Sequence, residues 1–256
     1  MLLSGQSRNA LSQYHLNKDF FQGENVDVFI HSWCEPFRIS LKNKSPGRES
    51  DRRIIFPRLS LRKIYKPVKI IVERPKSFKD RDLLLTKDLI LNTHPWADRY
   101  SNEFPKFTQY LLANNLSMWY SINKCFRLME DYSLKNNIPY KLVMRMRFDV
   151  FPKKIPKIFE SSQNNWVMIQ NMDLPKGMIN DWFAVGDYQG MKNYCSVFDN
   201  INDLFYRVIS SHKSWCNEHA LYEMLKVRNT SVNFTDFELK WDKLNYKSKM
   251  LNYLKY

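Results

Sequence analysis

The residues best suited to chemistry lie in one short stretch, where an apolar run ends in Arg145, Arg147 and Asp149. The run predicts a strand, and Phe151-Pro152 directly after it predicts a break. Ligands of open α/β sheets bind beyond the carboxyl ends of the strands. A carboxylate there can hold a divalent cation on a diphosphate, and both guanidinium groups can face the same phosphates. A structural ion pair at the strand end is the alternative.

The composition excludes several classes of protein. With 256 residues, of which 44% are hydrophobic, the chain can form a real core. Six glycines, and the lack of both Gly-rich phosphate-loop motifs, exclude the classical mononucleotide loops. Four scattered cysteines without C-x-x-C predict reduced thiols rather than a zinc knuckle or a disulfide framework. We expect neither a secretory signal nor a membrane span, and therefore a cytoplasmic location.

The formal net charge of +14 comes from 40 Lys and Arg against 26 Asp and Glu. Such a field would attract nucleic acid, anionic lipid headgroups or nucleotide diphosphates. The basic residues are scattered and no nucleic-acid-reading motif is visible, so general surface basicity is the simpler interpretation. We expect no nucleic-acid partner, while peripheral contact with a membrane is compatible with the charge.

The periodicity of apolar residues predicts an α/β protein. Predicted strands lie at residues 1–3, 26–31, 68–72, 140–147, 166–170 and 182–186. Predicted helices lie at residues 7 or 9 to 16, 60–64, 80–91, 107–136, 188–210 and 217–228. The long helix 107–136 feeds the charged strand directly, which favours a crossover connection and a parallel sheet.

We therefore predict a Rossmann-related, mostly parallel sheet flanked by helices, with a mixed second half. Residues 1–150 form the sheet half, and residues 151–233 form a second half of the same domain that covers the carboxyl edge of the sheet. The tail, residues 234–256, is rich in Lys and Tyr with weak periodicity, and is expected to run along the surface.

Three segments, in this order, resemble small nucleotide-sugar glycosyltransferases of the GT-A fold. They are residues 2–9 followed by 26–33, residues 140–149, and residues 180–186. The resemblance covers most of residues 1–225 and extends to enzymes with which large viruses and bacteria build surface glycans. It implies a GT-A-like fold, a UDP- or GDP-sugar donor, a glycan or glycoconjugate acceptor, and hexosyl or pentosyl transfer. The chain departs from the family's usual Asp-x-Asp, because Asp149 is followed by Val150 and Phe151.

Further candidate binding residues lie at the ends of the first two predicted strands. After the first strand, backbone N–H groups and a helix N-terminus would bind the nucleotide, and Arg8 would contact its phosphate. These residues are Ser4, Gly5, Gln6 and Arg8. At the second strand end, the rings of His31 and Trp33 would stack on the base or close the pocket. An ordinary strand-to-helix turn and a tryptophan at the edge of the core are the alternatives.

The resemblance also assigns roles to the charged residues. Asp149 would hold Mg²⁺ or Mn²⁺ and so stabilise the departing diphosphate. Without a metal, Arg145 and Arg147 would neutralise that leaving group, or one of them would tie down Asp149.

Inverting glycosyl transfer requires a base for the acceptor hydroxyl, whereas retaining transfer does not. Asp181 and Glu218 are the candidate catalytic carboxylates. Asp181 precedes a predicted strand, which can hold a reacting group closely. Glu218 opens a predicted helix, where a capping role is the alternative.

Other classes of function stay open at this point. A basic nucleic-acid-binding protein would explain the charge but leaves Asp149 and Asp181 without a role. A catalytically silent glycan-binding module would keep the fold and lose turnover. A phosphoryl- or nucleotidyltransferase would also need a metal-bound carboxylate, and the missing second nearby aspartate counts against it.

Overall fold

The structure is a computed structural model of the whole chain. It describes residues 1–6, 10, 14, 25–34, 57–76, 78, 104–152, 164–172, 174–213, 215–236 and 239–241. Within these ranges the side chains of residues 6, 57, 104–113, 151–152 and 239–241 are not described.

A seven-stranded mixed sheet forms the centre of the molecule, in the order β3-β2-β1-β4-β7-β6-β8. Its strands are β1 (Leu2–Gln6), β2 (Phe29–Trp33), β3 (Lys69–Glu73), β4 (Leu142–Arg147), β6 (Trp166–Gln170), β7 (Phe183–Asp187) and β8 (Ser231–Thr235). Only β7 among them runs against its neighbours, β4 and β6. A separate antiparallel pair joins β5 (Val150–Pro152) to β9 (Leu239–Trp241).

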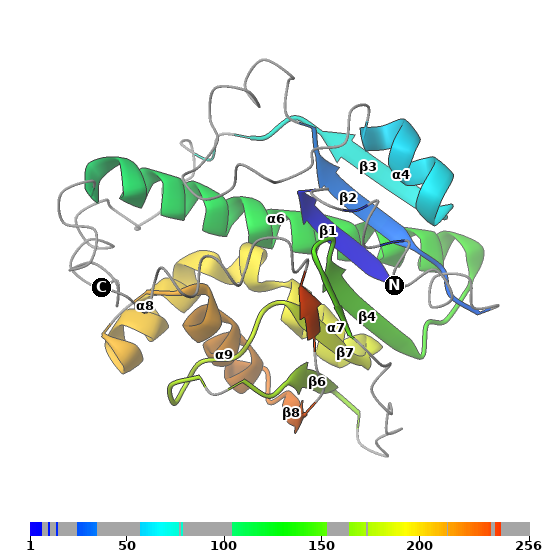
Figure 1. Ribbon diagram of the computed structural model, residues 1–256. Coiled ribbons are helices and arrows are strands. Elements are labelled where there is room, and N and C mark those ends of the chain that lie inside the picture. The colour runs from blue at the N-terminus through cyan, green and yellow to red at the C-terminus, as the bar shows by residue number, and fades with distance from the viewer. Residues whose placement is uncertain are drawn as a thin grey trace.

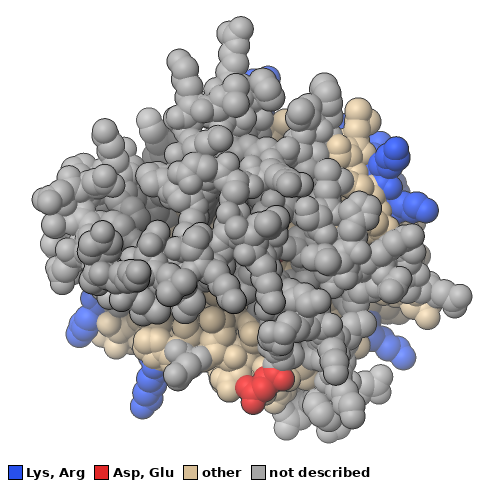
Figure 2. All heavy atoms as spheres, viewed as in Figure 1, with Lys and Arg blue, Asp and Glu red and all other residues tan. Residues whose placement is uncertain are grey.

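Helices flank this sheet (Figure 1). They are α4 (Pro57–Tyr65), α6 (Phe104–Asn136), α7 (Tyr188–Cys195), α8 (Ile201–His212) and α9 (Asn217–Val227), with a 3-10 turn, η2 (Val197–Asn200). The long helix α6 packs along β1 and β2, and α7 packs on β6 and β7, with α9 against α7 and α8 against α9. Lys and Arg side chains appear at several separate points on the outline of the molecule (Figure 2), which agrees with scattered basicity.

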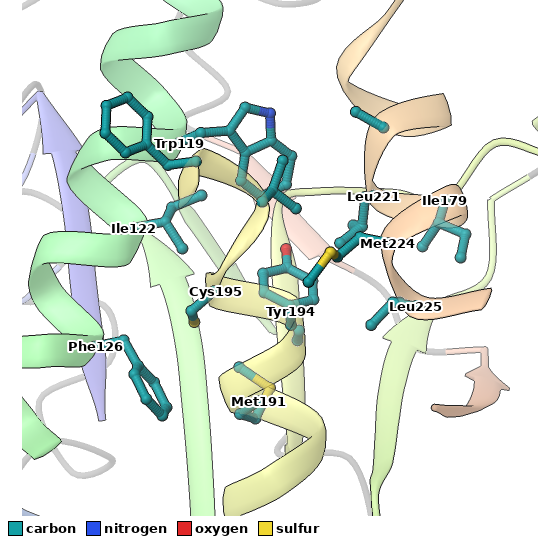
Figure 3. Packing of buried hydrophobic residues seen from close by; sticks show 14 of the residues in the cluster. Trp119, Ile122, Phe126, Ile179, Met191, Tyr194, Cys195, Leu221, Met224 and Leu225 are labelled. Carbon is teal, nitrogen blue, oxygen red and sulfur yellow. The ribbon is translucent and has the colours of Figure 1, made fainter. Parts of the chain in front are cut away.

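Successive residues of the central strands enter two different cores, because side chains alternate between the faces of a sheet. Leu2 and Phe29 join the core beneath α6, α7 and α9, whereas Leu3 and Ile30 join the core beneath α4. Figure 3 shows the larger core, in which Trp119 of α6 lies near residues of α7 and α9. Both faces of these central strands are therefore buried, and each strand begins with adjacent apolar residues, as in parallel sheets.

The prediction of an α/β sheet flanked by helices is confirmed, and so is the long helix before the charged strand. The prediction of one helix over residues 188–210 is wrong, since α7 and α8 are separated by η2. The Ser196 hydroxyl donates to the Asn193 carbonyl at 2.9 Å, as does the Ser196 N–H at 3.2 Å. A serine that bonds the local backbone in this way competes with helix continuation.

Three short strands were not predicted. β5 forms where the sequence indicated a break, and β9 lies in the segment expected to be a surface tail. β8 extends the sheet parallel to β6 and includes the first two residues of that tail. Alternation of Val232 and Phe234 with polar residues was the available signal for β8. The predicted helix at residues 80–91 lies outside the described residues. Of the predicted first helix only Ala10 and Tyr14 are described, and both are helical.

Candidate functional site

The pairing of β1 with β4 brings two parts of the predicted site together. Ser4 lies opposite Arg147 and Leu2 lies opposite Arg145, in parallel register. Paired residues of parallel strands point to the same side of the sheet. Since Leu2 belongs to the core beneath α6 and α7, Ser4 and both arginines also point to that face.

Two polar atoms of the candidate residues are buried without a hydrogen-bond partner, a state that Ser32 Oγ and Trp215 Nε1 share among the described residues. Arg145 is only 1% exposed, its Nε is unsatisfied, and its Nη1 donates to the Tyr194 hydroxyl at a long 3.5 Å. The Ser4 hydroxyl is also unsatisfied, and Ser4 is 2% exposed. A buried donor without a partner costs about 1 to 3 kcal/mol, and more when it is charged. Such groups in a native fold call for an explanation.

Gly5, near the end of β1, leaves space where a ligand could approach the backbone. Its φ is +112°, a conformation that L side chains rarely adopt, and a Cβ built there would meet nothing within 4 Å. Glycine within a strand often marks a place where another group approaches the backbone. Gln6 ends the strand, with its side chain outside the described atoms, and Arg8 lies outside the described residues.

Asp149 is held by Arg147 in a two-point ion pair. The Arg147 Nε donates to Oδ1 at 2.9 Å, and Nη2 donates to Oδ2 at 2.7 Å. Both side chains are about one-third exposed. One arginine therefore ties down the aspartate, which was one of the alternatives for this strand end.

The described residues do not provide a metal-binding set. No group of three or more His, Cys, Asp or Glu side chains within them is arranged to hold a metal ion. Each Asp149 oxygen already accepts a hydrogen bond from a guanidinium, which takes the place of a counter-cation. Metal binding by Asp149 thus stays a prediction, and no chemical step is assigned to a metal.

Asp181 reaches the same edge because β7 runs antiparallel to β4. Phe183, the first residue of β7, pairs with Met146, so the segment before β7 meets the carboxyl end of β4. Asp181 is 4% exposed. Burial raises the pKa of Asp181, while the nearby charges of Arg145 and Arg147 partly oppose that rise.

Glu218 joins this group through the start of α9. The Ile179 N–H donates to the Glu218 carbonyl at 3.3 Å, which ties the segment before Asp181 to the helix. Burial, followed by the charge of Asp181, raises the pKa of Glu218. The cap of α9 is Cys216, whose Sγ accepts from the His219 N–H at 3.4 Å. The N-cap role weighed for Glu218 therefore belongs to another residue.

His31 and Trp33 are engaged in the fold. The His31 Nδ1 lies 2.7 Å from the Ser121 hydroxyl, and its Nε2 lies 2.8 Å from the Glu73 carboxylate. Trp33 is 6% exposed and stacks on Tyr120, with ring centroids 5.5 Å apart. Both nitrogens of the buried imidazole are occupied, and the tryptophan matches the core-edge alternative.

Tyr194 is the contact that sequence reasoning missed. It lies on α7, 49 residues from Arg145 along the chain, and its apolar neighbours mark it as an ordinary core residue. No local pattern indicates the pairing of Tyr194 with Arg145.

Two surface pockets, of about 480 and 620 Å³, lie away from the candidate site. One is beside α6 and α7, and the other is between α8 and α9. The carboxyl ends of β1 and β2 lead directly into residues outside the described ranges.

Comparison of the chain with family models, with curated proteins and with solved structures finds no match. Among the described helices, none combines the length and the apolar character needed to cross a bilayer. The carboxyl edge of the sheet thus carries two arginines and an unsatisfied serine beside buried Asp181 and half-buried Glu218.

Proposed function

We propose that the protein is a glycosyltransferase that moves a sugar from a UDP- or GDP-sugar donor to a glycan acceptor. The observation that carries the proposal is the register of β1, β4 and β7. It brings a cationic pair, Arg145 and Arg147, to buried Asp181, and the start of α9 adds half-buried Glu218. The GT-A-like relationship expected from the sequence is part of this proposal.

The cationic side of the site suits a diphosphate leaving group. Guanidinium groups pair with phosphate oxygens in a defined geometry and keep their charge at any ordinary pH. Arg145 is buried with an unsatisfied Nε, and the Ser4 hydroxyl on the next strand is also unsatisfied. A phosphate oxygen at this edge would supply the missing acceptor, and the positive charge would stabilise the diphosphate as it departs.

The carboxylate side of the site suits proton transfer from an acceptor hydroxyl. A general base works best when its pKa lies near the working pH, and burial raises the pKa of both Asp181 and Glu218. In inverting transfer, Asp181 would take the hydroxyl proton and Glu218 would tune its charge. In retaining transfer, Asp181 would contact the donor sugar instead.

Titration calorimetry with UDP and GDP tests the binding part of the proposal. An assay of UDP or GDP release from the corresponding nucleotide sugars tests turnover. Arg145→Gln should weaken diphosphate binding about tenfold or more, because a charge-assisted contact contributes roughly 1.5 to 3 kcal/mol. Arg127→Gln is the control for charge, since it removes one guanidinium outside the site, where Arg127 pairs with Asp199 at 2.9 Å. Failure of every nucleotide and nucleotide sugar to bind would refute the proposal. Binding of a nucleotide sugar without turnover would favour a catalytically silent module with the same fold.

The metal question has its own test. If Asp149 holds Mn²⁺ or Mg²⁺, Asp149→Asn and EDTA should each abolish metal-stimulated turnover and leave the fold intact. Full activity in EDTA, with a severe loss in Arg147→Ala, would assign charge neutralisation to the arginines alone. Arg8→Ala tests in the same assay whether Arg8 contacts phosphate.

A further inference from the structure

Helix α4 carries a cationic face with an aliphatic side chain in its middle. Arg58, Arg62 and Lys63, with Lys66 directly after the helix, are all exposed, and the helix contains no acidic residue. Leu59 is 68% exposed. At 100° per residue, these five positions fall within an arc of roughly 140°, and Leu59 lies inside it.

The buried side of the helix adjoins this arc on the side of Arg58. Leu61 and Tyr65 are almost fully buried in the core that also contains Leu3 and Ile30. The Tyr65 hydroxyl donates to the Ala10 carbonyl at 2.9 Å. Packing therefore fixes which side of α4 points outward, and the cationic face is held in one orientation.

The fold does not explain the outward face. Arg58 lies in the first turn, where the helix dipole favours anions, and no acidic residue balances it. Arg58 and Arg62 are like charges four residues apart, an arrangement that weakens a helix. Within the part of the chain that the structure describes, the side chains of Arg58, Arg62, Lys63 and Lys66 make no hydrogen bond or ion pair.

We propose that this face docks the protein on an anionic lipid bilayer. The four cations would meet headgroup phosphates and carboxylates, and Leu59 would enter the boundary between headgroups and acyl chains. The helix flanks the β3 end of the sheet, far from β6 and β8 in the strand order (Figure 1). Lys and Arg side chains project from that edge of the molecule (Figure 2).

A bilayer fits this face better than a nucleic acid. Faces that bind single strands combine cations with exposed rings on which bases stack. The one aromatic ring of α4, on Tyr65, is buried, and the side chain exposed within the cationic arc is the aliphatic Leu59. Cations around an exposed aliphatic side chain are typical of helices that lie at a membrane surface. The inference does not depend on the proposed enzymatic activity.

Co-sedimentation of the full chain with lipid vesicles tests the proposal. We expect binding to vesicles of phosphatidylcholine with phosphatidylserine, and little binding to phosphatidylcholine alone. Arg62→Gln with Lys63→Gln should weaken that binding roughly 25-fold, at about fivefold for each cation lost. Raising the salt from about 0.1 M to about 0.5 M should release the parent protein, because screening shortens the range of the attraction.

A matched control separates the α4 face from net charge. Lys135→Gln with Lys141→Gln removes the same charge at two exposed positions outside α4 and should bind nearly as well as the parent. Leu59→Ser should weaken binding without changing the charge. Equal losses in the two double variants, or equal binding to both kinds of vesicle, would overturn the proposal. So would a result in which Arg62→Gln with Lys63→Gln weakens binding to a single-stranded DNA and leaves vesicle binding unchanged. Thermal melts of each variant confirm that the fold is intact.

Discussion

Replacing Asp181 by asparagine should make the protein more stable at pH 8 and much less active. Asp181 is 4% exposed, and burial raises its pKa above the ordinary 3.8 even though Arg145 and Arg147 oppose the rise. The folded protein therefore holds the Asp181 proton more tightly than the unfolded chain does. Asparagine keeps the shape and cannot ionise, so it removes the cost of burying the charge.

The sign and size follow from proton linkage. The stability contributed by a carboxyl group with a raised pKa is fully present below its unfolded pKa. That stability is lost as the pH rises from the pKa of the group in the unfolded chain through its pKa in the folded protein. At pH 8 the ionised Asp181 costs about 1.4 kcal/mol for each pH unit by which its pKa is raised. One such unit corresponds to a rise of about 3 to 6 °C in the Tm of Asp181→Asn for a chain of this size. The substitution also removes a negative neighbour of Glu218, which acts in the same direction.

Urea unfolding at pH 8 and pH 4, together with steady-state assays of donor turnover, measures both effects. The stability gain should be present at pH 8 and shrink at pH 4, and kcat should fall roughly 10²-fold or more if Asp181 is the base. Glu218→Gln should cost much less activity. Asp131→Asn, at an exposed position of α6, is the control and should change stability by no more than about 0.5 kcal/mol. A less stable Asp181→Asn at pH 8 would refute the reasoning, because the attraction of Arg145 would then outweigh burial.

Three further outcomes are expected. Gly190→Ala should destabilise the fold by about 2 kcal/mol or more in a thermal melt, because its Cβ would lie 2.1 Å from the Trp166 carbonyl oxygen and backbone would have to move. Burial lowers the pKa of His31, so urea-measured stability should fall as the pH drops below 6.5, where the unfolded chain takes the proton first, and His31→Asn should reduce that dependence. Arg147→Ala should cost only about 1 kcal/mol of stability, since its pair with Asp149 is partly exposed, but about tenfold in calorimetric diphosphate affinity.

Local sequence patterns were sufficient to predict the helices and strands whose apolar residues repeat regularly within the element itself. The apolar spacing of α6 and the continuous apolar run of β4 predicted both elements, because burial of one helix face or of a whole strand repeats at a fixed period. The charged end of β4 likewise predicted where Arg145, Arg147 and Asp149 would lie. The break between α7 and α8 was missed, because it depends on how Ser196 bonds its local backbone rather than on periodicity.

The sequence by itself thus determined the α/β class, the main elements and the charged strand end. Only the tertiary structure decided which strands pair and in which direction. The reversed β7 places Asp181 beside Arg145, and α9 adds Glu218. The structure also decided that His31 serves the fold through Ser121 and Glu73. Strand partners and buried hydrogen bonds join residues tens of positions apart, and a pattern with a period of two or 3.6 residues holds no information about such partners.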